Sequence, residues 1–261
     1  MFSKQYQFGS KVFRLEAPVP IAEALHSELF RADGLPADVT ISATLSDTMP
    51  EGATLRTEKG ADNTLFIYAA VQEAPDGVRL TLLPNYKDAL TCHHMLQYAG
   101  FSHLLLQNGL CILHSACILL DGQAILFSAP SGTGKSTQAD LWALYRGVQI
   151  VNGDRTLLRA DGTAHGVYFS GESPYCEPFH APIRAIVCLT QAPKSSVSRI
   201  AGAEALRALY SQCAFDLHNA EEVSRAIDLL MSLIPRIPIY RLNATADISA
   251  VEVLENALRE E

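Results

Sequence analysis

Hydrophobic and polar positions alternate in short runs through the first third of the chain. The runs over 38–46, 53–59 and 63–71 are rich in β-branched or aromatic residues, and a fourth run covers 78–84. A period of two residues with this composition is typical of half-buried strands. The Pro-Asp-Gly sequence before the fourth run favours a hairpin turn. The pattern predicts a small β-rich N-terminal domain over 1–86.

The spacing of apolar residues changes after this region. They recur every three to five positions, at Leu90, Met95, Tyr98, Phe101 and Leu105. This spacing places them on one face of a helix. An Asn-Gly pair at the end of the segment is typical of a helix C-terminus. We expect a linking helix over 87–109.

Strands and helices alternate from residue 110 onward. Two apolar runs, over 110–120 and 123–129, flank Asp121-Gly122. This two-residue turn predicts a hairpin of antiparallel strands. Further strands are expected over 147–151, 156–162, 164–170, 182–192 and 238–243, and helices over 136–146, 203–213, 219–233 and 249–260. The alternation predicts an α/β protein.

A glycine-rich segment, SAPSGTGKST, lies between a predicted strand and a predicted helix. A phosphate loop needs glycines that let backbone N–H groups converge on phosphate oxygens, a lysine, and a hydroxyl for Mg²⁺. The helix N-terminus beneath the anion adds to the attraction. Ala129 replaces the first glycine of the usual pattern, which is a small departure. We expect ATP and Mg²⁺ as cofactors, with the nucleotide held by Ser131, Gly132, Thr133, Gly134, Lys135, Ser136 and Thr137.

Two residues outside this loop are candidates for the chemistry. Asp154 follows a strand-like run 19 residues beyond Lys135, a gap that holds one helix and one strand. It could therefore reach the Mg²⁺ bound by Ser136; the alternative is a turn aspartate. His114 lies on the strand antiparallel to the one that leads into the loop. It is either a base or a partner for Asp154, or a satisfied histidine in a half-buried strand.

The composition narrows the classes of partner. The formal net charge is −8 and the sequence shows no basic stripe, which argues against nucleic acid and anionic membranes as partners. No apolar stretch is long enough for a membrane span, and the N-terminus lacks the apolar run of a signal peptide. The six cysteines are scattered with no C-x-x-C pair, as in proteins of a reducing cytosol. We expect a cytoplasmic protein.

The ordered set LHSACILLDGQAILFSAPSGTGKST, IVNGDRTLL and VYFSGESPYCEP resembles the HPr kinase/phosphorylase family and its relative, ATP-dependent phosphoenolpyruvate carboxykinase. The resemblance covers 110–192. It implies a phosphate-loop kinase-like domain with a mixed sheet over 110–261, with His114 supporting catalysis and Ser136 binding the metal. The family also has a pair of aspartates for the base and a metal contact. Only Asp154 of that pair is present, because Gly153 occupies the other position.

The missing aspartate leaves the metal site incomplete. A glutamate that meets the metal in the kinase family also has no counterpart in YFSG over 168–171. Glu172 and Glu177 lie just beyond and could substitute, and we take Glu177 as a candidate metal ligand beside Ser136 and Asp154. The alternative is that both glutamates are ordinary loop carboxylates.

The resemblance implies Mg²⁺- and ATP-dependent phosphoryl transfer to a hydroxyl, and we expect the acceptor to be a serine of a protein or peptide. The later segments look closer still to HPr-kinase-like proteins of unsettled substrate, some of which phosphorylate ribosomally made peptides. In this interpretation Lys135, Asp154 and His114 carry the chemistry, and the N-terminal domain contacts the acceptor or a second copy of the chain. The alternatives are a nucleotide-binding scaffold without turnover, a carboxykinase, or a small-molecule kinase.

Overall fold

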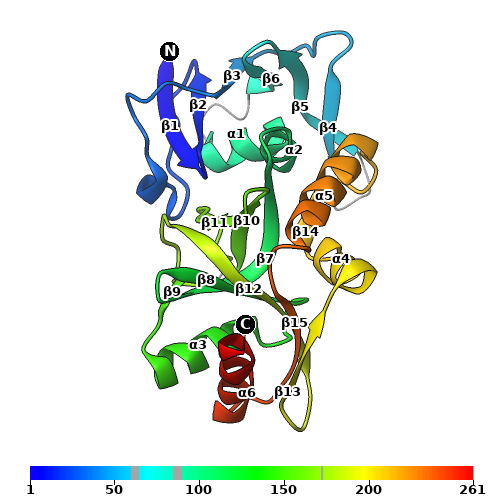
Figure 1. Ribbon diagram of the computed structural model, residues 1–261. Coiled ribbons are helices and arrows are strands. Elements are labelled where there is room, and N and C mark those ends of the chain that lie inside the picture. The colour runs from blue at the N-terminus through cyan, green and yellow to red at the C-terminus, as the bar shows by residue number, and fades with distance from the viewer. Residues whose placement is uncertain (60–64, 85–89, 172, 261) are drawn as a thin grey trace. The chain divides into compact units, whose positions relative to one another are not determined.

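The computed structural model describes residues 1–59, 65–84, 90–171 and 173–260. The protein is mixed α/β, with two mixed sheets and, in the described residues, six α-helices (Figure 1). The chain divides into two compact units, Met1–Leu104 and Leu105–Glu261. This division falls within the segment predicted to link two domains.

The first unit is built on a six-stranded sheet with the order β1-β2-β3-β6-β5-β4. Its strands are β1 (Phe2–Phe8), β2 (Lys11–Ala17), β3 (Val39–Leu45), β4 (Thr54–Lys59), β5 (Leu65–Ala74) and β6 (Gly77–Leu82). The β2–β3 and β3–β6 pairs are parallel, and the other pairs are antiparallel. Of the strand predicted over 63–71, residues 63 and 64 lie outside the described part. The sequence pattern missed β1 and β2, which supply core residues such as Phe8 and Phe13.

Two helices, α1 (Cys92–Ala99) and α2 (Phe101–Gln107), stand where one was predicted over 87–109. Gly100 separates them with a φ of 79°, in the left-handed region. Its N–H donates to the carbonyl of Gln97, so the residue caps α1 rather than continuing it. The prediction of a single helix was wrong because it counted apolar spacing and passed over this glycine. Residues 87–89 of that prediction lie outside the described chain.

A polar cluster is centred on Glu23 in the first unit. Its two carboxylate oxygens accept hydrogen bonds from Lys4 at 2.5 Å, Tyr6 at 2.7 Å, Ser27 at 2.7 Å and Arg31 at 2.8 Å. Burial acts to raise the pKa of Glu23, but these four donors outweigh burial and lower the pKa to about 2. Glu23 is therefore ionised throughout the neutral range and ties together β1 and the segment after β2.

The second unit is built on a nine-stranded sheet with the main order β11-β10-β7-β8-β12-β15-β13, and β9 and β14 also pair with β7. Its strands are β7 (Leu110–Leu120), β8 (Gln123–Ser128), β9 (Gln149–Asn152), β10 (Arg155–Arg159), β11 (Thr163–His165), β12 (His180–Gln191), β13 (Ser196–Ile200), β14 (Cys213–Ala214) and β15 (Ile239–Ala244). The hairpin predicted for β7 and β8 is confirmed. Parallel pairing of β12 with both β8 and β15 makes the sheet mixed.

Helices cover both faces of this second sheet. The helices are α3 (Lys135–Arg146), α4 (Gly202–Tyr210), α5 (Ala220–Leu233) and α6 (Ile248–Arg259). Successive β7 residues face opposite sides: Cys117 packs in the core that contains α4 and α5, whereas Ile118 packs in the core that contains α3 and α6 (Figure 1). All four helices were predicted to within a few residues. Among the helices of the described chain, none combines the length and apolarity needed to cross a membrane.

One predicted strand, over 164–170, is wrong beyond residue 165. β11 ends at His165 because the following segment pairs with a side chain instead of a strand. The Nδ2 of Asn152 donates to the carbonyls of Val167 at 3.0 Å and Phe169 at 3.4 Å. The segment consequently passes over the end of β9 as a loop.

Candidate functional site

The glycine-rich loop connects β8, which ends at Ser128, to α3, which begins at Lys135. Gly132 and Gly134 have φ angles of 77° and 109°, in the region that side chains disfavour. Gly134 is the N-cap of α3 and brings no side-chain hydrogen bond to the first turn. The N–H groups of this turn therefore present the partial positive charge that favours an anion.

Lys135 is buried beneath the loop with 7% of its surface exposed. Its Nζ donates to the carbonyl of Ala129 at 3.0 Å and to that of Pro130 at 3.4 Å. Burial lowers the pKa of Lys135, and the charge of Asp154 acts in the opposite direction. The small Ala129, which departs from the usual motif, is itself a core residue and supplies one of these carbonyls.

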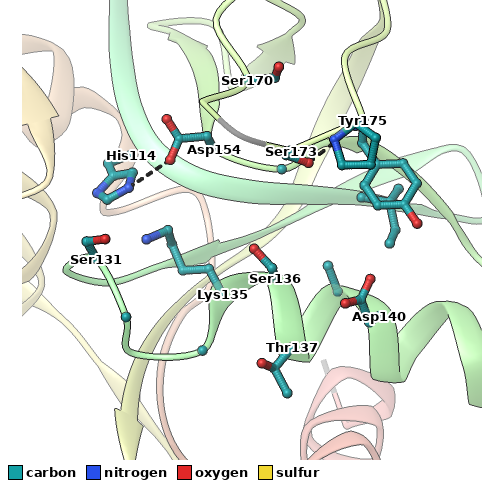
Figure 2. Close-up of a pocket in the computed structure, with 16 residues that line it drawn as sticks. His114, Ser131, Lys135, Ser136, Thr137, Asp140, Asp154, Ser170, Ser173 and Tyr175 are labelled. Carbon is teal, nitrogen blue, oxygen red and sulfur yellow. Dashed lines mark hydrogen bonds and ion pairs between the residues drawn. The ribbon is translucent and has the colours of Figure 1, made fainter.

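A cavity of about 830 Å³ opens above the loop (Figure 2). Most of the predicted site residues line it, including His114, Lys135, Ser136 and Asp154. The lining residues that the sequence did not suggest are Ala139, Asp140, Ile150, Gly153, Ser170, Ser173, Pro174 and Tyr175. Of the predicted nucleotide ligands, Thr133 is not in the lining. The helical spacing of Asp140 from Ser136 could have revealed Asp140, whereas the 170–175 segment was marked only by the resemblance of VYFSGESPYCEP to the kinase family and not as part of the cavity.

His114 and Asp154 lie side by side at the edge of this cavity. Their Nε2 and Oδ1 atoms are 3.0 Å apart, which confirms that the two lie close together, although it leaves their roles open. The contact follows from antiparallel pairing of β7 with β10, in which His114 stands opposite Arg155. Burial and the Lys135 charge lower the pKa of His114 from its usual 6.5, and Asp154 offsets them only in part. His114 is therefore neutral at pH 7.

The position of Asp154 is fixed through its backbone and its second oxygen. Asn152 is fully buried, and its Oδ1 accepts from the N–H groups of Asp154 and Arg155, both at 2.9 Å. The Asp154 carbonyl accepts from the N–H of Ser115 at 2.9 Å. Its Oδ2 lies 3.3 Å from Nε of Arg155, whose guanidinium lies over the ring of Phe169. These contacts hold one side of the carboxylate and leave the other side to the cavity.

Ser173 packs against Gly153, and Gly171 packs against Asp154. A Cβ on Gly153 would lie 1.9 Å from Oγ of Ser173, so no larger residue fits without movement of the segment. On the other side, a Cβ on Gly171 would lie 3.1 Å from Cγ of Asp154. Gly171 also has a φ of 58°. Both glycines are thus required by the close approach of this segment to Asp154.

The metal ligands predicted from sequence are only partly together. Ser136 and Asp154 both line the cavity, and hydroxyl and carboxylate oxygens are donors that suit Mg²⁺. Glu177 is exposed and outside the lining, and its N–H donates to the carbonyl of Val151. Glu172 lies outside the described residues. No group of three or more His, Cys, Asp or Glu suited to a metal occurs in the described parts of the chain.

Comparison with known proteins assigns no family to the chain: no protein-family model matches it, and no curated protein matches it significantly.

Proposed function

We propose that the unit Leu105–Glu261 is a phosphate-loop kinase domain of the HPr kinase type, which transfers the γ-phosphoryl group of ATP to a hydroxyl. One observation carries the proposal. A loop with two left-handed glycines and a buried lysine lies below a cavity, and the His114–Asp154 pair lines the same cavity. Phosphoryl transfer depends on positioning and charge stabilisation more than on covalent chemistry, and this arrangement provides both.

Each residue has a distinct task in this proposal. The N–H groups of the loop and of the first turn of α3 bind the phosphate oxygens. Lys135 exchanges its bonds to the loop carbonyls for the β- and γ-phosphates. Mg²⁺, held by Ser136 and Asp154, would neutralise charge between the phosphates. Asp154 also takes the proton from the acceptor hydroxyl, while neutral His114 orients its carboxylate.

A nucleotide-binding regulator without turnover is the second candidate, and the geometry of Gly153 favours it. Ser173 fills the space beside Gly153, so Asp154 has no neighbouring carboxylate at that position. One carboxylate must then serve as both metal contact and base. If it cannot do both, the site binds nucleotide and does not turn it over.

The proposed acceptor is a serine of a peptide or protein. The first unit carries a sheet whose outer strands, β1 and β4, are its edges, and Leu55 on β4 is 44% exposed. A sheet edge can bind an extended peptide through main-chain hydrogen bonds. We also propose a cytoplasmic location, since all six cysteines are free, as in a reducing compartment.

The test uses the full chain with ATP and Mg²⁺. Calorimetry measures binding in the wild type and in Lys135→Ala, and γ-labelled ATP measures transfer to pools of peptides and of small hydroxyl metabolites. Binding that depends on Lys135, with label in the peptide pool, supports the kinase. Label in the metabolite pool alone would point to a small-molecule kinase, and binding with no labelled product would point to the regulator. No binding at all rejects the nucleotide site.

A further inference from the structure

Ser173 reaches the candidate nucleotide cavity at the end of a turn that begins at Ser170. The N–H of Ser173 donates to the carbonyl of Ser170 at 3.0 Å, and the N–H of Tyr175 donates to Oγ of Ser173 at 3.2 Å. Ser173 lines the same cavity as Lys135 and Ser136 (Figure 2). The turn thus holds a hydroxyl inside the cavity that the phosphate loop borders.

Ser173 lies next to the residue that precedes the candidate base. Its Oγ is 1.9 Å from the point that a Cβ of Gly153 would occupy, so it takes the place of a side chain one residue before Asp154. On the same segment, the Cβ position of Gly171 is 3.2 Å from Oδ2 of Asp154. Close packing at the two glycines thus brings Gly171 against Asp154, and Ser173 against the residue before it.

The Ser173 hydroxyl is also chemically suited to react. In its hydrogen bond with Tyr175 the oxygen acts as acceptor, which leaves its own proton to be donated. Ser173 is half-buried, so the hydroxyl is partly shielded from water. Ser170 lines the cavity too, but it is buried, and Figure 2 shows its hydroxyl pointing away from the phosphate loop. Of these two serines, Ser173 is therefore the more accessible.

We propose that Ser173 is an intramolecular phosphate acceptor, an inference that rests on the proposed nucleotide function. In this step Oγ of Ser173 forms a bond to the γ-phosphorus of the bound nucleoside triphosphate. The bond from that phosphorus to the oxygen bridging the β-phosphate breaks, and a nucleoside diphosphate leaves. The Ser173 proton passes to the carboxylate of Asp154. A phosphate on Ser173 would then repel Asp154 and displace the segment from the cavity.

The experiment incubates the purified full chain with ATP and Mg²⁺ and follows intact mass, with peptide mapping to locate any phosphate. We expect one phosphoryl group on Ser173 in the wild type and in the matched control Ser170→Ala. We expect none at this position in Ser173→Ala or Lys135→Ala. Asp154→Asn should slow the reaction about 100-fold or more, the usual scale for loss of a general base. The fractional rate should not change with protein concentration, because the step is intramolecular.

Nucleotide binding and phosphate on Ser173 are measured separately, so that failure of this inference can be told from failure of the proposed nucleotide function. Calorimetry with ATP is run on every variant. Bound nucleotide with no phosphate on Ser173 overturns the inference alone, whereas absent binding overturns both. A fractional rate that rises with protein concentration also rejects the intramolecular step. Since Ser173 packs against Gly153, Ser173→Cys serves as a second variant that keeps the size of the side chain and removes the hydroxyl. Retained phosphate at another residue in that variant would count against Ser173.

Discussion

Two carboxylates, one in each compact unit, have contrasting surroundings. Glu23 accepts hydrogen bonds from four side chains, with two donors on each oxygen. Asp154 has one side-chain partner on each oxygen, His114 and Arg155, and lines a cavity of about 830 Å³. Both are similarly accessible, with side chains 30% and 25% exposed. Exposure therefore does not distinguish them.

The difference lies in how many acceptor positions are taken. An ionised carboxylate has about four lone-pair sites. The four donors around Glu23 fill them, so this group can stabilise the fold but cannot readily take up a further ligand. Asp154 keeps acceptor capacity that faces the cavity, where a metal ion or an acceptor hydroxyl could bind. A saturated carboxylate indicates a structural role, and an unsaturated one beside a cavity indicates chemistry.

The largest effect should come from nucleotide. At a hundredfold excess over its Kd, ATP with Mg²⁺ should raise the free energy of unfolding of the wild type by about 2.7 kcal/mol. Lys135→Ala should remove most of this gain, because the phosphates lose their buried cation. Glu23→Gln is the control, since it alters the saturated carboxylate and should keep the gain. Thermal denaturation with and without nucleotide measures the gain in the wild type and in each variant. An equal gain in all three proteins would contradict the assignment of the loop as the nucleotide site.

The next effect concerns the two carboxylates themselves. Glu23→Gln should lower the free energy of unfolding by about 2 kcal/mol, because charge-assisted hydrogen bonds weaken and one amide hydrogen meets a donor. Asp154→Asn should cost about 1 kcal/mol or less, since its partners are fewer and partly solvated. Urea denaturation of both variants tests the comparison. Equal losses would mean that Asp154 is as structural as Glu23.

A smaller effect is expected from filling the space at Gly153. Gly153→Ala should cost about 1–2 kcal/mol because the new Cβ overlaps Oγ of Ser173. Ser173→Gly should restore most of that loss in the double variant, as expected for residues in direct contact. A double-mutant cycle by urea denaturation measures the coupling. Additive losses would show that the 170–175 segment is not held against Gly153.

The dependence of stability on pH should distinguish the two units by the pH at which stability is lost rather than by the size of the loss. The pKa of His114 lies below its usual 6.5 in the folded chain, so its contribution is complete above that pH and is lost as pH falls below it. The pKa of Glu23 drops from 4.5 to about 2, so its contribution is lost only between those values. The measurement is the free energy of unfolding of the wild type, His114→Gln and Glu23→Gln across pH 2–8. Each variant should lose the pH-dependent fall in stability that its own residue causes. If both variants changed the stability curve over the same pH range, the two residues would not titrate separately as proposed.

The sequence predicted those parts of the site that depend on short segments. The spacing of Gly132, Gly134 and Lys135 is local and predicts the loop before its contact with Gln191 is known. The proximity of His114 and Asp154 could be predicted as well, because a tight hairpin and a short gap bring them to one end of a sheet. Their hydrogen bond at 3.0 Å agrees with this argument.

The rest could not be predicted because it depends on contacts between distant segments. Asn152 directs the 166–170 segment away from β structure with its amide, and no local pattern announces that partner. Ser173 follows this segment and lines the cavity, away from the loop that the glycine spacing predicts. In the fold, β1 and β2 were missed although Tyr6, Phe8 and Phe13 on them are buried. The break at Gly100 was hidden by apolar residues on either side.

The two-residue turn at Asp121 and Gly122 bears on the order in which the second unit assembles. Both residues have left-handed backbones, with φ of 52° and 76°, which suits the turn that matches the twist of paired strands. Strands joined this way meet with little loop entropy, and hairpins form in about 1–10 μs. The β7–β8 platform of the phosphate loop should therefore nucleate early, and β12, which must travel farther along the chain to join β8, should dock later. A substitution in this turn should slow folding while leaving the finished site unchanged.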